Sequence, residues 1–123
     1  MTQGERNQFD PMAAAIDWLD AYRAASLSIV DMYADDASLD CRCDGQKVLL
    51  GRGSITEYWK LRFIDKPAYE LEDLQFDGDG IVVSYRAPKG IVRAILNFEA
   101  NGKIKRSRCG SAAEIVPLRN TRW

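Results

Sequence analysis

The sequence predicts one α+β domain: a cone-shaped, curved antiparallel (mixed) sheet of six strands wrapped around three N-terminal helices. Three observations predict it. Apolar residues recur at helical spacing over 12–35 and again over 54–64, a strand hairpin lies between these two regions, and four turn-bounded strands follow. This order of elements excludes a parallel α/β sheet. The chain has 123 residues, the size of one domain, which we divide into a mobile arm (1–10), the domain (11–110) and a C-terminal tail (111–123).

Three short polar signals predict where the helices begin. Asp10-Pro11 offers an N-cap aspartate and a proline at the first helical position, which predicts a helix over 12–25. Ser26 and Ser54 are N-caps for further helices over 26–35 and 54–64. The buried face expected for the first helix carries residues at three- and four-residue steps: Met12, Ala15, Ile16, Leu19 and Tyr22.

Six strands are expected to start near residues 37, 46, 69, 81, 91 and 103, with a bulge near Asp73. Turns are expected at Asp44-Gly45, Gly78-Asp79, Lys89-Gly90 and Asn101-Gly102, the last being the strongest signal. Taking the last two as two-residue loops sets the register of the last three strands. The expected pairs are Tyr85 with Ala94, Val83 with Leu96, Arg86 with Arg93, Ala94 with Cys109, Leu96 with Ser107 and Phe98 with Lys105.

Composition excludes several classes of function. The 17 basic and 18 acidic residues balance to a net charge of −1, so neither a nucleic acid nor a membrane surface is an expected partner. No apolar run approaches the ~20 residues of a membrane span, and residues 1–10 lack a signal-peptide core. We therefore expect a cytoplasmic protein.

The chain contains three cysteines and no histidine. Without histidine, Ser-His and Cys-His nucleophile pairs and histidine zinc motifs are excluded. Three thiols also fall short of the four of a closed all-cysteine zinc site. No metal and no other cofactor is therefore expected, and any chemistry must use carboxylates, tyrosine, lysine, arginine or a thiol.

Two local motifs carry a resemblance to a known family. The segment 32–38, Met-Tyr-Ala-Asp-Asp-Ala-Ser, resembles the junction of helix two and strand one in SnoaL-like proteins and ketosteroid isomerases. Gly51 and Gly53, followed by Ile55, Tyr58 and Trp59, are similar to the glycine-plus-helix-three signature of that group. The resemblance to the nuclear transport factor 2-like (cystatin-like) superfamily covers about residues 12–110 and implies a ligand pocket between helices and sheet. The fold hosts isomerases, cyclases, hydrolases, dehydratases and binding subunits.

The catalytic residues of ketosteroid isomerases do not carry over to this chain. The position of the helix-one tyrosine falls on Asp17, that of the strand-one base on Cys41, and that of the oxyanion aspartate on Ala94. None of these residues matches the isomerase pattern, so that mechanism is not expected here.

Asp17 is nevertheless the candidate catalytic residue, because a carboxylate in an apolar pocket can act as an acid or base near neutral pH. The width of helix faces favours the alternative, in which Asp17 lies in solvent. The expected pocket lining, with Tyr85 as the main ligand contact, is Trp18, Tyr22, Leu39, Cys41, Trp59, Tyr85, Ala94, Leu96, Ser107 and Cys109.

The resemblance implies that strand one lies beside the last strand, so Cys41 and Cys109 should be neighbours and reduced. Because no histidine can activate them, packing is favoured over reactivity.

The outer face of the sheet is expected to form a homodimer interface. Two arginines opposite one another on neighbouring strands, as expected for Arg86 and Arg93, are destabilising unless an anionic group pairs with them. A two-fold interface would supply one, and it would bury Ile104 with these residues: Arg86, Ile91, Arg93, Ile95, Arg106 and Arg108.

Two functions remain open at this point. The first is binding of a small apolar ligand without the ketosteroid isomerase residues. The alternative is an isomerase, lyase, cyclase or hydrolase that uses a pocket carboxylate as acid or base, without metal or histidine. Polar side chains that converge on one point would favour catalysis, whereas a fully apolar lining would favour binding.

Overall fold

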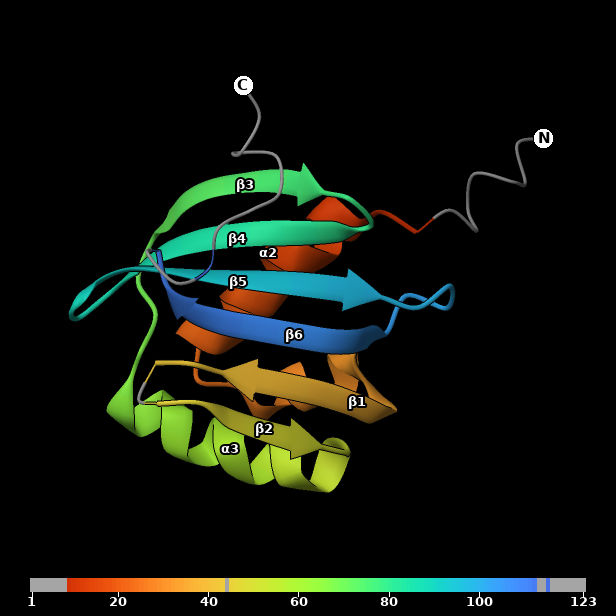
Figure 1. Cartoon of the computed structure of the whole chain (residues 1–123), viewed down its shortest axis with the longest axis horizontal. Coiled ribbons are helices and arrows are strands. Elements are labelled where there is room, and N and C mark those ends of the chain that lie inside the picture. The colour runs from red at the N-terminus through yellow and green to blue at the C-terminus, as the bar shows by residue number, and fades with distance from the viewer. Residues whose placement is uncertain (1–8, 44, 113–114, 116–123) are drawn as a thin grey trace.

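The computed structural model describes residues 9–43, 45–112 and 115 (Figure 1). Within these residues the helices are α2 (Pro11–Arg23), the 3₁₀ helix η1 (Leu27–Met32) and α3 (Arg52–Asp65). The strands are β1 (Tyr33–Cys41), β2 (Lys47–Leu50), β3 (Leu71–Asp77), β4 (Gly80–Ala87), β5 (Gly90–Phe98) and β6 (Ile104–Ser111). The α+β class and the order of elements are those expected.

The six strands form one mixed sheet in the order β2-β1-β6-β5-β4-β3. The β1–β6 pair is parallel and every other pair is antiparallel. In Figure 1, α2 crosses behind the sheet and α3 runs along its β1–β2 end. Residues of both α-helices, of η1 and of the inner sheet face form one apolar core, so one face of the sheet is the buried one. Among the described residues, every helix is too short or too polar to cross a membrane.

The start of α2 confirms the predicted cap. The Asp10 carboxylate accepts hydrogen bonds from the backbone N–H of Met12 (3.0 Å) and of Ala13 (3.3 Å), which satisfies donors that have no intrahelical partner. The buried stripe of the helix is Ala15, Trp18, Leu19 and Tyr22. Ile16 was expected in this stripe but is 42% exposed.

The second helix is shorter than expected. Ser26 caps it as predicted, accepting from the Ser28 N–H, but the helix is of the 3₁₀ type and ends at Met32. β1 begins at Tyr33 rather than near 37, because Tyr33 pairs with Ile104 of β6 and its side chain is fully buried. Strand pairing and burial of the Tyr33 side chain therefore outweigh the local helix signals.

The predicted Ser54 cap of α3 is wrong. The helix starts two residues earlier, at Arg52, and its N-cap is Gly51 with φ 87° and no side-chain cap bond. Glycine adopts this left-handed φ without the strain that a side chain would add.

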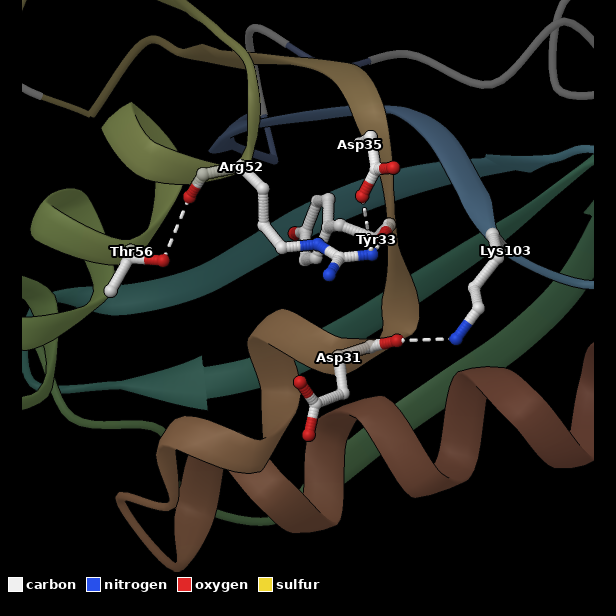
Figure 2. A network of polar contacts seen from close by, with 6 residues as sticks. All are labelled: Asp31, Tyr33, Asp35, Arg52, Thr56 and Lys103. Atoms are coloured by element: carbon white, nitrogen blue, oxygen red, sulfur yellow. Dashed lines mark hydrogen bonds and ion pairs between the residues drawn. The ribbon is translucent and has the colours of Figure 1, made fainter.

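A polar network holds the start of α3 against β1 (Figure 2). The Arg52 guanidinium donates to the Tyr33 carbonyl at 2.8 Å and pairs with the Asp35 carboxylate at 3.1 Å. Thr56 donates back to the Arg52 carbonyl, and Lys103, from the β5–β6 turn, donates to the Asp31 carbonyl at 2.7 Å. Helix, strand and turn are thus joined at one corner of the molecule.

The β5–β6 register is partly as expected. Ala94 pairs with Cys109 and Leu96 with Ser107, as predicted. A register shift after Asn97 then places Phe98 opposite Ile104 rather than Lys105. The shift turns Ile104 into the core, where it is fully buried, so its predicted place on the outer face is wrong.

The β4–β5 register differs by two residues from the expected one. Ala87 pairs with Gly90, so the loop is Pro88-Lys89, and Tyr85 lies opposite Val92 and Val83 opposite Ala94. Arg86 therefore lies opposite Ile91, not Arg93. Proline presets the φ of the first loop position, a signal the prediction did not use. Because the slip is even, each side chain keeps its predicted face.

At β3, the register shift between Leu71 and Asp73 confirms the predicted bulge.

The outer sheet face is partly covered by the chain itself. Val82, Ile95 and Ile115 form a second apolar cluster in which Ile95 is only 4% exposed. Arg93 donates to the carbonyls of Ala112 (3.1 Å) and Ile115 (3.0 Å). Ile95 was expected to be free for a second subunit, but it is already buried.

Arg86 also forms ion pairs with residues of its own chain. Its guanidinium lies 2.7 Å from Glu72 and 3.9 Å from Glu70. The expectation that four unpaired arginines share this face is therefore wrong for Arg86 and Arg93.

Candidate functional site

The centre of the cone is filled by aromatic side chains. The rings of Trp18, Tyr22, Trp59 and Tyr85 pack edge to face, with centroid separations from 4.8 to 6.3 Å. All ten residues expected to line a ligand pocket are buried in the structure. Of these ten, Cys41 is the one that lines either of the two hollows described next.

Two hollows open beside α3. The first, here the α3 hollow, has a volume of about 440 Å³ and lies between α3 and β2; its lining includes Cys41, Lys47, Leu49, Tyr58, Leu61 and Arg62. The second, the β4–β5 hollow, has a volume of about 370 Å³; its lining includes Cys43, Arg62, Pro88, Ile91, Val92 and Ser111. Arg62 forms part of the wall of both.

Arg62 is a buried guanidinium, 5% exposed, on the inner side of α3. Its Nε donates to the Tyr22 hydroxyl at 2.8 Å, and its two terminal nitrogens donate to the Sγ atoms of Cys41 (3.8 Å) and Cys43 (3.4 Å). The Tyr22 hydroxyl in turn donates a hydrogen bond to the Lys66 carbonyl. Arg62 thereby links α2, α3 and the end of β1.

In the part of the chain that the structure describes, no carboxylate lies within ion-pair distance of Arg62. The positive charge instead faces aromatic rings, with the guanidinium carbon 5.8 Å from the ring centroids of both Tyr22 and Tyr58. Such contacts stabilise a cation by about 0.5–2 kcal/mol. A buried charge usually requires an opposite charge as well, and no carboxylate among the described residues supplies one.

The three cysteines of the chain meet beside Arg62. All three are free thiols, and their Sγ atoms lie within 4.8 Å of one another. Hydrogen bonds from the Cys109 and Cys43 thiols lower the pKa of Cys41, and the same interaction raises the pKa of Cys109 well above its usual range. The Tyr58 hydroxyl lies 3.7 Å from the Cys109 Sγ. The predicted proximity of Cys41 and Cys109 is confirmed, since they are partners across β1 and β6.

Tyr85, the expected ligand contact, is fully buried. Its hydroxyl makes no hydrogen bond to any described residue, and burial raises its pKa well above the usual range. The residue does not line either hollow. Its position therefore indicates a core role.

Asp17, the candidate catalytic residue, lies on the exposed face of α2. The inward position beside it is taken by Trp18, whose Nε1 donates to the Tyr33 hydroxyl at 3.3 Å. The buried stripe of α2 passes on either side of residue 17 without including it. The pocket role of Asp17 is therefore wrong, and the alternative, a solvated carboxylate, is correct.

Solved structures show which fold this arrangement belongs to, whereas no family model and no curated protein matches the sequence. A SnoaL-like protein of unknown function from Burkholderia thailandensis matches with a TM-score of 0.69 and 22% identity, over 89% of this chain and 96% of that one. The chain therefore has the α+β fold of these structures, the nuclear transport factor 2-like (cystatin-like) fold.

Two further structures with this SnoaL-like fold agree. An uncharacterized cystatin-fold protein from Novosphingobium aromaticivorans has a TM-score of 0.68 and 20% identity, over 83% of this chain and 98% of its own. SalBIII, an epoxide hydrolase/cyclase-like enzyme in pyran ring formation of the polyether salinomycin, has a TM-score of 0.66 and 19% identity, over 89% and 93%. At these identities the likeness establishes the fold and leaves the function open.

Within the SnoaL-like fold, the sequence prediction missed Arg62 and Cys43 as site residues. The helical spacing of Ile55, Tyr58 and Trp59 puts Arg62 on the same apolar face of the third helix. A charged residue on a buried helix face is itself a signal of a specific partner. Cys43 shares a strand face with Cys41, but its position next to the Asp44-Gly45 turn favours an exposed side chain.

Proposed function

We propose that this SnoaL-like chain binds a small organic molecule in the α3 hollow, and that Arg62 holds a carboxylate or other anionic oxygen of that molecule. The observation that carries the proposal is the buried Arg62 guanidinium, which meets no carboxylate among the described residues. Arginine has five N–H groups, and three of them are used by Tyr22, Cys41 and Cys43. The other two N–H groups have no acceptor among the described side chains and could bind a ligand at the wall of the hollow.

The rest of the hollow suits an amphipathic ligand. Leu49, Leu61 and the ring of Tyr58 provide apolar surface in its lining. A volume of about 440 Å³ lies within the ~300–1,000 Å³ range of small-molecule sites. The proposal therefore replaces a wholly apolar ligand at the cone centre with an apolar body that carries an anionic end, bound beside α3.

The experiment compares arylcarboxylic acids with the matching carboxamides by calorimetry. For the wild type we expect the acids to bind more tightly, since hydrogen bonds to charged groups contribute about 1.5–3 kcal/mol. Arg62→Met should remove this preference, by roughly 10–100-fold, while Arg62→Lys retains part of it. Arg23→Met, which removes an exposed arginine at the end of α2, is the matched control and should change nothing.

Circular dichroism verifies that each variant is folded. Equal binding of acids and amides by the wild type, or a preference that survives Arg62→Met, would contradict the proposal.

A second candidate is catalysis in the same hollow. Arg62, Tyr58 and Cys41 all line it, and polar groups that act on one point in a pocket favour an enzyme. Arg62 and Tyr58 together would stabilise an oxygen that gains negative charge, as in isomerisation or ring closure. The SalBIII neighbour makes epoxy alcohols reasonable first substrates.

For this candidate, Tyr58→Phe should lower kcat by ~10²–10³ with little change in KM, as for loss of an oxyanion donor. Asp17→Asn should leave the rate unchanged, because Asp17 is exposed. Turnover that is indifferent to Tyr58→Phe would leave binding as the better account.

A further inference from the structure

The three thiols form a triangle of the size that a metal ion requires. Around one tetrahedral ion with metal–sulfur bonds of ~2.3 Å, the sulfur ligands lie about 3.8 Å apart. The Sγ atoms of Cys41, Cys43 and Cys109 are all within 4.8 Å of one another, so the triangle needs to contract by at most about one ångström.

The backbone holds this triangle in place. Cys41 and Cys109 are paired residues of the parallel strands β1 and β6. The Arg42 N–H donates to the Cys109 carbonyl at 2.8 Å, which continues the ladder past the end of β1. Cys43 follows two residues after Cys41, so its side chain returns to the same side, where an isolated bridge joins it to Gly45. Three rigidly placed ligands favour binding, because little order remains to be imposed.

An ion could enter from either hollow. Cys41 lines the α3 hollow and Cys43 lines the β4–β5 hollow, while Cys109 lies behind them with 9% exposure. A fourth ligand position on the hollow side would remain open to water. Sites with three protein ligands and one open position are the pattern of reactive rather than purely structural zinc.

Charge selects the kind of ion. Three thiolates and a divalent cation together carry one negative charge, which the guanidinium of Arg62 neutralises. Arg62 already donates to two of the three sulfurs, at 3.8 Å and 3.4 Å, as an outer-shell partner would. A monovalent ion would leave an excess negative charge, and a trivalent ion would leave Arg62 unbalanced. Sulfur ligands exclude magnesium and calcium, which prefer oxygen.

We propose that Cys41, Cys43 and Cys109 bind one thiophilic divalent cation, such as Zn²⁺, with Arg62 as the neutralising outer-shell partner. Binding forms three metal–sulfur bonds and releases the three thiol protons to solvent. The proposal does not depend on the proposed function, because the metal is tested without any organic acid present.

The chain is well suited to a spectroscopic test, since these are its only cysteines and it has no histidine. Any sulfur-to-metal charge-transfer band must therefore come from this cluster. Reduced, metal-free protein is titrated with Cd²⁺ and Co²⁺, and Zn²⁺ is then added as a competitor. We expect one equivalent of metal per chain, an ultraviolet thiolate band, about three protons released per ion, and displacement of Co²⁺ by Zn²⁺.

Variants separate this site from adventitious binding. Cys43→Ala and Cys109→Ala should each weaken binding by more than ~100-fold, and Arg62→Met by ~10–100-fold, the usual cost of an outer-shell change. Asp65→Asn is the matched control, because Asp65 offers an exposed carboxylate to both hollows and should not matter. If Cys109→Ala fails to fold, the half-buried Cys43 still tests the cluster.

Three results would overturn the proposal. They are the absence of a thiolate band at stoichiometric metal, a ratio of one metal to two chains, and binding that depends on Asp65 but survives the loss of Cys43.

Discussion

Cys41 of β1 lies directly opposite Cys109 of β6, on neighbouring parallel strands of the sheet. This one pairing brings the first strand of the chain against the last and places both thiols beside Arg62. Neither residue belongs to the aromatic centre of the cone. The buried guanidinium and the three thiols therefore lie together at one end of the sheet, next to α3, beside the aromatic centre.

Removing the hydroxyl group of Tyr85 or of Tyr22 should have different effects on stability. Tyr85→Phe should leave the free energy of unfolding nearly unchanged or slightly raised, because the Tyr85 hydroxyl is buried without a hydrogen bond to a described residue. Tyr22→Phe should cost about 1–3 kcal/mol, since it leaves the Arg62 Nε and the Lys66 carbonyl without the Tyr22 hydroxyl. Urea unfolding of the two variants measures the difference. A larger loss for Tyr85→Phe would show that its hydroxyl has an essential partner.

Alkaline pH should destabilise the fold through Tyr33. Burial raises the pKa of Tyr33 from 10.0 to about 12, while hydrogen bonds with Ser107 and Trp18 lower it by less. Between these two values the unfolded chain loses the phenolic proton and the folded chain keeps it. The stabilisation is thus complete below pH ~10 and falls by about 1.4 kcal/mol per pH unit up to ~12.

The measurement for Tyr33 is urea unfolding from pH ~8 to ~11. Tyr33→Phe serves as the comparison: it should be less stable than the wild type near neutral pH, where two buried hydrogen bonds are lost, but should show a shallower decline above pH ~10. Parallel pH profiles for the two proteins would refute the assignment.

The start of α3 offers a matched pair of glycines. Gly51→Ala should destabilise by about 1–3 kcal/mol, because φ 87° is costly for a residue with a side chain. Gly53→Ala should be neutral or stabilising by about 0.4–1 kcal/mol, since it lies within the helix and an added methyl group would meet no atom within 4 Å. Thermal unfolding compares the two. Equal effects would mean that the helix does not begin at Gly51.

A homodimer through the outer sheet face stays a prediction, with a changed interface. Ile95 and Ile104 are buried within the chain, and Arg86 and Arg93 have partners. Arg106, which is exposed, and Arg108, whose Nε is buried without a partner among the described residues, remain available to a second subunit. We expect sedimentation at micromolar concentration to show a dimer that Arg106→Glu weakens. A wild-type monomer would end the prediction. Ile95→Glu no longer serves as its test, because that change should destabilise the fold itself.

The sequence was sufficient for the fold because its strongest signals are local. The Asp10 cap, the alternation of the strands and the Ala94–Cys109 register all follow from neighbouring residues. The errors arose where a distant contact decides. Tyr33 belongs to β1 because it pairs with Ile104 of β6, and the register shift after Asn97 turns Ile104 inward. The Pro88-Lys89 loop was a missed local signal.

The site was less accessible to sequence reasoning for a physical reason. Spacing along a helix or strand predicts which residues face inward, but not whether they meet a hollow or pack against one another. Trp18, Trp59 and Tyr85 face inward as predicted and fill the space that was expected to hold a ligand. Arg62 and Cys43 meet only because α3 docks beside the end of β1, a three-dimensional relation that no local pattern contains.

The parallel pairing of β1 with β6 also has a consequence for synthesis. During translation β1 and β2 leave the ribosome early, but one edge of β1 has no partner until Ile104–Ser111 has been made. Until then Tyr33, Ala37 and Leu39, which are fully or almost fully buried in the folded chain, cannot complete their packing. Contacts between such distant segments form slowly, and exposed strand edges favour aggregation in the interval. Newly made chains of this protein should therefore depend on chaperones until nearly the whole domain has emerged.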